Sequence, residues 1–515
     1  MTRITLTFLL LLLLIHPLGV VAAPPDLAVA REALTILENR HWNTHLDIPA
    51  IIGAGVGGLR LALQHAGIVA ADLQELPAGL DEPAALQAFG DRLDRAVALA
   101  GGKIPERTLL YSGLRAMLKA VGGSHTVFLT PTQRTVAEAI LQGKPYDGIG
   151  INFVKSDEHW ILSAVIPGAP ADRAGVRRGD QVVQIDGVAV DGLDSPEIQG
   201  LFLGPPGTVM QMTVLRGGAQ LPFVIARGAV TRPVADSGMI TDEIAYLKLY
   251  GYSLGSAKII RTELTRLLAA RPRGLIVDLR EDGGGLITEY VETMGLFLPR
   301  GSVVYQEIGR DGVPKIGRTT GDPIVPAIPL VVLIDVGAAS NGELSAAALK
   351  EQRGASLVGE HTAGELEYAT LLGLVDGSGM NVAFARVLTA KGVEIEGHGY
   401  PPDVAIPLDP GGTRDLQLEC AVRVMVGRLS GIPALGCDRS VLRSLPRASS
   451  PLLITPPRRR ATGTRTTSRP PRPDGTSRPG SSWPTPSRPG SWPRTPSRSR
   501  PLPGTRGCAR RCPRR

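Results

Sequence analysis

Apolar runs that alternate with amphipathic helical patterns constrain the second half of this 515-residue chain more than any other feature. The segments GLIVDLR, LVVLID and ASLVGE are rich in Val, Ile and Leu, as are strands that are buried on both faces. The stretches SAKIIRTELTRLLAAR and LITEYVETMGLFL have the three- and four-residue apolar spacing of helices. This alternation predicts a layered α/β core over residues 231–425.

Two regions with different sequence patterns precede this core. Residues 24–145 contain helical patterns such as LAVAREALTILENRHW and ERTLLYSGLRAMLKAVGG, which predict an α-helical N-terminal region. Residues 146–230 change to short alternating strands with Gly and Pro turns, as in HWILSAVIPGAPADRAGVRRGDQVVQIDG. The chain is therefore expected to be a multidomain α/β protein with a β-rich domain inserted before its core.

The first 23 residues predict export. A basic Arg3 precedes a short apolar run, and the small pair Ala22-Ala23 stands before Pro24, which is the pattern of a cleaved secretory signal peptide. No later stretch has the twenty apolar residues of a membrane span. We expect the mature protein to be periplasmic or extracellular.

The C-terminal residues 426–515 differ from the rest in charge and composition. Residues 447–515 hold 17 Arg, no Lys and one acid, Asp474, so an acidic body precedes a basic segment rich in Pro and Ser. Such a composition predicts a low-complexity tail that is mostly disordered. It would make at most weak contact with anionic envelope surfaces, and we expect no requirement for nucleic acid.

Four cysteines raise the question of disulfides in an exported chain. Cys420 and Cys437 flank a short helix and turn and could pair, whereas Cys508 and Cys512 lie in the tail. Free thiols are the alternative for all four.

The stretch VVLIDVGAASNGELSAAAL carries one hydroxyl, Ser340, from a strand to the start of a helix. Ser340 is either a helix N-cap or a nucleophile on a strand-to-helix elbow, with Ser345 as a rival nucleophile one turn inside the helix. An oxyanion would be met by the N–H of Asn341 and by one from Gly283 or Gly284, in the triple glycine after GLIVDLRED.

Residues 146–230 resemble a PDZ domain, most specifically in PADRAGVRRGDQVVQIDG. In that family a glycine-containing loop captures the terminal carboxylate of a peptide, and the peptide adds a strand to the sheet edge. The resemblance assigns this binding loop to Gly148, Ile149 and Gly150. The alternative is a PDZ-shaped spacer that binds nothing.

From about residue 110 to 425 the chain resembles the C-terminal processing peptidases and their tricorn-type serine protease relatives. The matching elements are LIVDLREDGGG, with Asp282 where Asn is usual, the elbow GAASNGE, the strand and loop LVGEHTAGE, and the closing EIEGHGYPPDVAI. The resemblance implies a core of the ClpP/crotonase-like kind and a peptidase that needs no cofactor and no metal.

One position departs from the Ser/Lys branch of these peptidases. The lysine expected 25 residues after the serine is Glu365 here. The tricorn-type branch instead implies Ser340 as the nucleophile and His125 as the general base, with Ser124 and Glu396 orienting the imidazole. His361 and His398 are the rival histidines, and Glu396 could also be an ordinary turn carboxylate.

The resulting hypothesis is an exported serine endopeptidase with a Ser/His-based site and no Ser/Lys dyad. Its partners would be polypeptide substrates that the PDZ domain recruits through their exposed C-termini. The alternatives are an inactive peptide-binding protein of the same fold, and a scaffold whose basic tail docks on envelope polymers.

Overall fold

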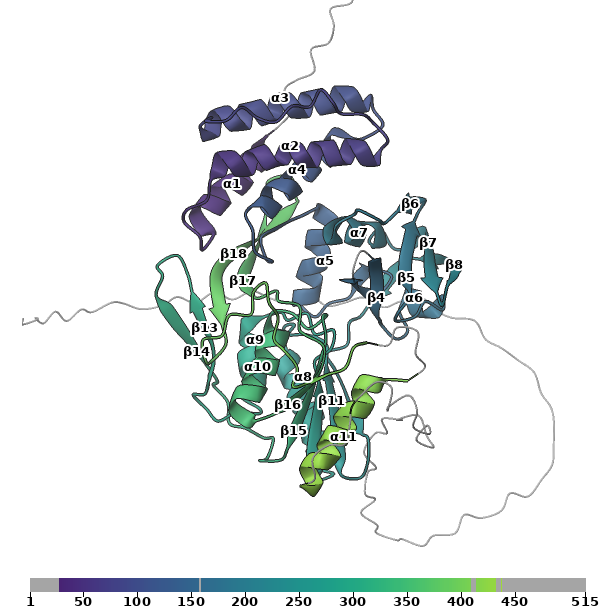
Figure 1. Ribbon diagram of the computed structural model, residues 1–515, viewed down its shortest axis with the longest axis vertical. Helices are drawn as coiled ribbons and strands as arrows, with labels where there is room; N and C mark the ends of the chain where they lie inside the picture. Colours follow the sequence, from purple (N-terminus) through teal and green to yellow (C-terminus); the bar gives the residue numbers. More distant parts are fainter. Residues whose placement is uncertain (1–26, 157–158, 409–413, 432–436, 438–515) are drawn as a thin grey trace, which may run out of the picture. The chain divides into compact units, whose positions relative to one another are not determined.

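The computed structural model describes residues 27–156, 159–408, 414–431 and 437 (Figure 1). The predicted signal peptide, most of the predicted tail, and Cys508 and Cys512 lie outside these residues. In the part of the chain that is described, no helix is both long enough and apolar enough to cross a membrane.

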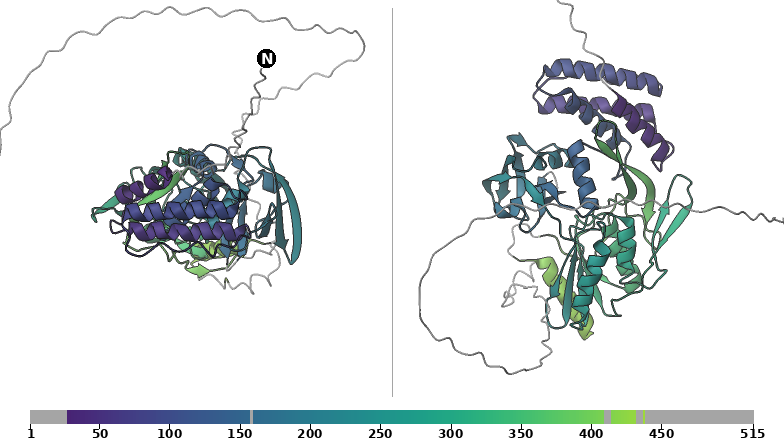
Figure 2. Two further views of the ribbon diagram at one scale, coloured as in Figure 1. Left: turned by 90° about the horizontal axis from the view of Figure 1, so that it is seen from above. Right: turned by 180° about the vertical axis from the view of Figure 1, so that it is seen from behind.

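Four helices form the N-terminal region. They are α1 (Ala28–Arg40), α2 (Ile48–His65), α3 (Glu82–Ala100) and α4 (Glu106–Ala120). Asp47 and Asp81 cap α2 and α3 by accepting backbone N–H bonds, and each of these helices has Pro in its first turn. In both Figure 1 and Figure 2, α2 and α3 lie side by side, and buried residues such as Leu59 and Phe89 pack between the helices.

The segment after α4 connects the helices to a sheet. It contains β1 (Val127–Leu129) and α5 (Pro131–Leu141), which begins with a capping box at Thr130. β1 pairs with β18 (Gly379–Leu388), whose Met380 and Val382 also join the core of the N-terminal helices. The sheet order is β1-β18-β13-β14, with β17 also paired to β18. The other bounds are β13 (Val303–Ile308), β14 (Pro314–Arg318) and β17 (Glu367–Gly373).

The inserted β-rich domain is closed at its base by a short antiparallel pair, β2 (Tyr146–Gly148) with β9 (Gly228–Val230). Its main sheet has the order β3-β4-β5-β7-β8, so β3 lies at an edge, and β6 pairs with β5. The strands are β3 (Ile151–Ser156), β4 (His159–Val165), β5 (Gln181–Ile185), β6 (Val188–Ala189), β7 (Val209–Arg216) and β8 (Ala219–Ala226). The helices are α6 (Pro170–Arg173) and α7 (Ser195–Phe202).

The α/β core is a six-stranded sheet with the order β10-β11-β12-β15-β16-β19. Only the β10–β11 pair is antiparallel among these described strands. The strands are β10 (Ala235–Met239), β11 (Ile244–Leu249), β12 (Gly274–Asp278), β15 (Leu330–Ile334), β16 (Ser356–Gly359) and β19 (Val404–Ala405). The helices are α8 (Ser256–Leu268), α9 (Ile287–Met294), α10 (Asn341–Arg353) and α11 (Leu416–Ser430).

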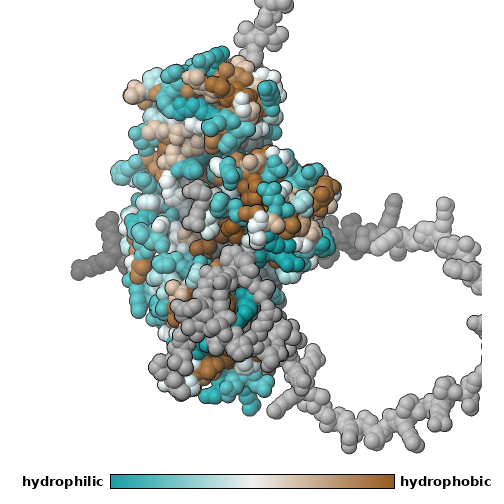
Figure 3. Space-filling view, turned by 45° about the vertical axis from the view of Figure 1, so that its right-hand side comes forward, coloured by the Kyte–Doolittle hydropathy of each residue, from teal (hydrophilic) through white to brown (hydrophobic). Residues whose placement is uncertain are grey.

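Helices cover both faces of this sheet. Residues of α8, α9 and α10, such as Ile260, Tyr290 and Leu344, belong to one buried cluster, and residues of α11, such as Met425, belong to another (Figure 1). On the face shown in Figure 3, hydrophobic residues are scattered among hydrophilic ones, as on most folded proteins. The predicted architecture of N-terminal helices, an inserted β domain and a layered α/β core is confirmed.

The end of the core differs in one detail from the sequence-based boundary. α11 continues to Ser430, beyond residue 425, and Cys420 of this helix forms a disulfide with Cys437. Of the two alternatives for this cysteine pair, the structure therefore has the bridge. The bridge joins Cys437 to the helix that covers the second face of the sheet.

Candidate active site

Ser340 occupies a strained turn between β15 and α10. Its φ of 54° and ψ of −122° lie in a region that residues with a side chain rarely adopt, at a cost of roughly 1–3 kcal/mol. Its N–H donates to the carbonyl of Glu365 at 2.9 Å and to the carboxylate of Glu343 at 3.1 Å. Such a turn presents a serine side chain at the start of a helix, as a nucleophile elbow does.

Glu343 braces this elbow, and the sequence analysis missed it. Its fully buried carboxylate accepts the N–H groups of Ser340, Gly364 and Glu365 and the hydroxyl of Thr362. Burial raises the pKa of Glu343 to about 7, although these hydrogen bonds oppose the shift. The Ser-x-x-Glu spacing of Ser340 and Glu343 is the sequence signal of a capping box and could have identified it.

The triple glycine packs directly against the elbow. A Cβ added to Gly284, whose φ is +80°, would lie 2.6 Å from the Cβ of Ser340 and 3.0 Å from its Oγ. The Gly284 N–H donates to Asp282 at 3.0 Å. In contrast, the N–H groups of Gly283 and Asn341 form no hydrogen bond to any residue that the structure describes.

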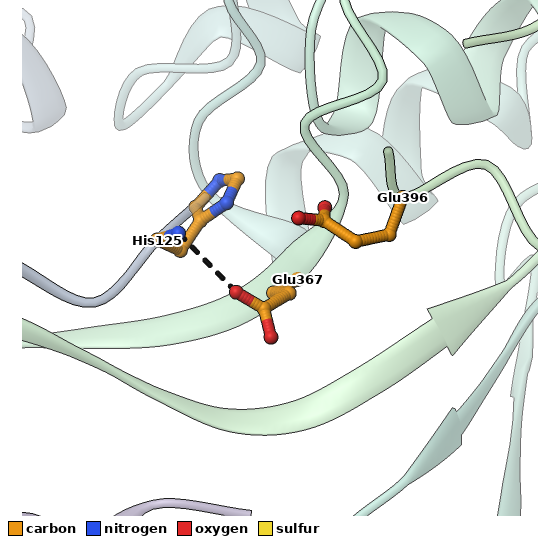
Figure 4. Close-up of side chains that lie close together, drawn as sticks. All are labelled: His125, Glu367 and Glu396. Atoms are coloured by element: carbon orange, nitrogen blue, oxygen red, sulfur yellow. Dashed lines mark hydrogen bonds between the residues drawn. The ribbon is translucent and has the colours of Figure 1, made fainter. Parts of the chain in front are cut away.

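The side chains of Ser124, His125 and Glu396 lie together, as the sequence analysis expected. The Ser124 hydroxyl is 2.6 Å from His125 Nδ1 and donates to Glu396 at 2.9 Å. Figure 4 shows the carboxylate of Glu396 turned toward the imidazole. Burial lowers the pKa of His125 to about 4, so the ring is neutral at ordinary pH.

Glu367, on β17, is a second buried acid that the sequence analysis missed. Its carboxylate accepts the N–H groups of Ser124 and His125 at 3.1 and 3.2 Å and the indole N–H of Trp42 at 2.8 Å (Figure 4). No local signal identifies it, because Ser124 and Trp42 are far away in the sequence.

The His125, Glu367 and Glu396 ligand atoms lie within 4.8 Å of one another and could in principle hold a metal ion. Both carboxylates already accept hydrogen bonds from the protein, and Nδ1 of the ring faces Ser124. These contacts favour a hydrogen-bonded brace that holds Ser124 and His125 against β17 and Glu396.

The rival residues lie elsewhere or are occupied. His361 and His398 are exposed, and His398 Nδ1 contacts the carbonyl of Glu396 at 2.8 Å. Ser345 is buried, donates to the Asn341 carbonyl at 2.7 Å and lies 2.6 Å from the Tyr252 hydroxyl. Ser345 is therefore a packed, hydrogen-bonded residue inside α10 and does not lie on the elbow.

The predicted peptide-binding loop lies at the start of β3. Gly148 ends β2 and pairs with Gly228 of β9, Ile149 is buried in the domain core, and Gly150 has a φ of +78°. The carbonyls of Ile149 and Gly150 accept N–H bonds from Ala171 and Ile166 at 2.9 Å. The N–H groups of Ile149 and Gly150 have no hydrogen-bond partner among the described residues, so they are available to a ligand.

Comparison with known proteins identifies the family. Peptidase family S41 matches residues 243–406, and the PDZ domain family matches residues 161–216. The C-terminal processing peptidase of Tetradesmus obliquus chloroplasts is 30% identical over 323 residues, which cover 59% of this chain and 69% of that protein. This chain belongs to peptidase family S41. The predicted C-terminal processing peptidase family with a PDZ domain is thus confirmed, and the chain is a serine peptidase.

A further relative agrees with this assignment, and a solved structure agrees with the fold. A carboxyl-terminal-processing protease of Synechocystis sp. is 29% identical over 345 residues, covering 63% of this S41 peptidase and 80% of the relative. The solved structure of a photosystem II D1 C-terminal processing protease covers 79% of this chain and 98% of its own, with a TM-score of 0.51 and 24% identity. That structure supports the fold, which agrees with the predicted class.

The family assignment corrects one prediction. Family S41 uses a Ser/Lys dyad, so the predicted reaction on a Ser/His-based site without such a dyad is wrong. The geometry gives a physical reason, because the hydrogen bonds of His125 go to Ser124 and Glu367 and none joins it to Ser340 in the described residues. Residue 365 remains a glutamate, and no lysine that the structure describes hydrogen-bonds to Ser340.

The contact between Gly284 and Ser340 yields a test. Gly284→Ala should lower kcat at least about 100-fold, because the added methyl cannot fit and the backbone would shift away from the elbow. Gly283→Ala is the matched control, since its Cβ would meet no atom within 4 Å and the N–H is kept. Steady-state kinetics on a tagged peptide measures kcat for both variants, and thermal melts show whether they are folded. Equal losses of kcat in two folded variants would contradict the prediction.

Proposed function

We propose that this S41 peptidase hydrolyses polypeptides with Ser340 as the nucleophile and the N–H groups of Gly283 and Asn341 as the oxyanion donors. Three structural features that meet at Ser340 support the proposal. The elbow holds Ser340 in a strained turn, Gly284 allows the glycine loop to contact it, and two backbone N–H groups beside it have no partner among the described residues.

The chemistry follows from this arrangement. The Ser340 oxygen would add to the peptide carbonyl carbon while its proton passes to a base, and the carbonyl oxygen would become an oxyanion. Two N–H donors in a water-poor site stabilise that charge. Loss of the amine leaves an acyl-serine ester, which water then hydrolyses to regenerate the hydroxyl.

Ser340→Ala should remove hydrolysis of casein or a tagged peptide and leave the fold intact, because replacing one hydroxyl creates only a small cavity. A fluorophosphonate probe should label the wild type and not this variant. Unchanged turnover in a folded Ser340→Ala protein would contradict the assignment.

Ser345→Ala is the matched control for that experiment. It removes a buried hydroxyl of α10, together with its bonds to Asn341 and Tyr252, at a cost to stability of about 1–3 kcal/mol. The probe should still label this variant, because the nucleophile is retained.

We also propose that the PDZ domain selects substrates with exposed, apolar C-termini. β3 lies at the edge of its sheet and can accept a peptide as a further strand, beginning at the free N–H groups of Ile149 and Gly150. Phe153 of β3 lies 5.4 Å from Phe202 of α7, ring centre to ring centre, which supplies an apolar surface for a ligand side chain.

Amidation of the C-terminus of a model peptide should weaken its binding about tenfold or more, because it removes the charge that the loop N–H groups would meet. Fluorescence anisotropy with matched acid and amide peptides measures the difference. Equal affinities would show that the domain is a spacer or binds internal segments.

We further propose that the protein is exported. Support comes from the predicted signal peptide and from the Cys420–Cys437 disulfide, since disulfides persist mainly in oxidising compartments. Mass spectrometry of the protein from an exporting host should give a mature N-terminus at Pro24. Retention of residues 1–23 in the accumulated protein would contradict this proposal.

A further inference from the structure

The carboxyl group of Asp282 lies buried behind the glycine loop, where this peptidase family usually has Asn. Its side chain is fully buried, and one oxygen accepts the Gly284 N–H at 3.0 Å. The other oxygen, Oδ2, has no hydrogen-bond partner among the described residues. An unpaired oxygen in such a place is tolerated far better in a neutral carboxyl than in a carboxylate.

Asp282 is connected to the elbow as well as to the glycine loop. Its backbone carbonyl accepts the N–H of Ala339 at 2.9 Å, one residue before Ser340. Its side chain holds Gly284, whose Cα lies against Ser340. Asp282 itself touches no reacting atom in this arrangement, so it would act on the reaction through its hydrogen bond to Gly284 and through its charge.

The charge of the Asp282 carboxyl matters because a negatively charged oxyanion develops near it during the reaction. An oxyanion on the Gly283 and Asn341 N–H groups would form close to Asp282, because Gly283 directly follows it. In a region of low dielectric a second negative charge opposes the oxyanion strongly. A neutral Asp282 keeps the hydrogen bond to Gly284 without that repulsion.

The surroundings set the protonation of Asp282. Burial raises its pKa, and the Gly284 N–H, Arg232 and Lys248 lower it, with a net value of about 7. The Tyr252 hydroxyl is the other titratable group that interacts with it, and burial raises the pKa of that hydroxyl well above its usual range. The neighbouring Glu281 faces away, toward Ser163, Asn152 and Asp335, and Glu343 is bonded on the far side of the elbow.

We propose that Asp282 is a positioning residue that acts as a proton-controlled switch: its neutral carboxyl holds the glycine loop for oxyanion binding, and its ionised form opposes the oxyanion. The inference rests on the proposed role of Ser340. According to this inference, activity falls at alkaline pH because Asp282, which holds the glycine loop, becomes ionised.

The decisive experiment compares the pH dependence of kcat and KM for the wild type and Asp282→Asn, which is uncharged and nearly the same shape. If only the neutral form is active, wild-type kcat should fall about 50-fold between pH 7 and pH 9, because the neutral fraction is about one half at a pH equal to the pKa of about 7 and about one hundredth two units above it. The Asn variant should lack this fall, and KM should change little in either protein.

Glu281→Gln is the matched control. Burial also raises the pKa of Glu281 to about 7, but its carboxylate contacts Ser163 and Asn152 of the PDZ domain rather than the glycine loop. This variant should keep the wild-type alkaline fall. The inference is overturned if Glu281→Gln removes the fall, or if Asp282→Asn keeps it.

Thermal melts provide a readout that does not depend on activity. A carboxyl whose pKa is raised by folding stabilises the folded state at low pH, and this contribution is lost as pH rises through about 7. From pH 5 to pH 8 the wild type should therefore lose more thermal stability than Asp282→Asn. Parallel losses would show that Asp282 does not titrate in this range and would overturn the inference.

The same data separate this inference from the proposed function. If Ser340→Ala is as active as the wild type, the proposed nucleophile fails, whereas the melts still report whether Asp282 titrates. If activity depends on Ser340 but the Asp282→Asn profile matches the wild type, only the switch fails.

Discussion

The contact between two loops at the carboxyl edge of the core sheet determines the arrangement of the site. β12 and β15 are parallel neighbours, so the loops that follow them leave the sheet at the same edge. The Asp282 carbonyl accepts the Ala339 N–H, and Asn341 Nδ2 donates to the Gly285 carbonyl at 2.9 Å. These bonds hold the glycine loop against the elbow. The strained turn at Ser340 is maintained because the residues before and after it, Ala339 and Asn341, are both held by hydrogen bonds.

Glycine at two positions makes this contact possible. A Cβ at Gly284 would overlap the Ser340 side chain, and one at Gly342 would lie 2.3 Å from the Asp282 carbonyl oxygen. The two loops therefore approach each other backbone to backbone. Such an approach leaves N–H groups at the surface of the contact, which is where an oxyanion can be bound.

Carboxylates that are buried or half-buried fix the surrounding backbone. Glu343 binds the N–H groups of the segment 364–365, Glu396 binds the Leu366 N–H at 2.6 Å, and Glu367 binds those of residues 124 and 125. At each carboxylate, backbone N–H donors replace hydrogen bonds from water. These bonds offset part of the free-energy cost of removing the carboxylate from water. Segments that are far apart in sequence thus share one rigid network, and the β1–β18 pairing places the Ser124-His125 segment within it.

Local patterns in the sequence predicted the layers of the core, the helical N-terminal region, the β-rich insert and the strand-to-helix turn at Ser340. These features leave local patterns in the sequence, namely apolar periodicity, turn residues and clusters of small residues. Such patterns can be recognised without knowledge of the fold. The proximity of Ser124, His125 and Glu396 also agreed with expectation, although only through a family resemblance.

The folded structure was needed to show which buried acids brace the site, which glycine N–H already has a partner, and that Cys420 pairs with Cys437. It also showed that His125 is hydrogen-bonded to Ser124 rather than to Ser340, while the family comparison corrected the predicted catalytic dyad. The physical reason is that these outcomes depend on strand register and on the approach of loops separated by hundreds of residues. A hydrogen bond such as that from the Ser124 N–H to Glu367 has no local pattern, because neither residue carries information about the other until the sheet is formed.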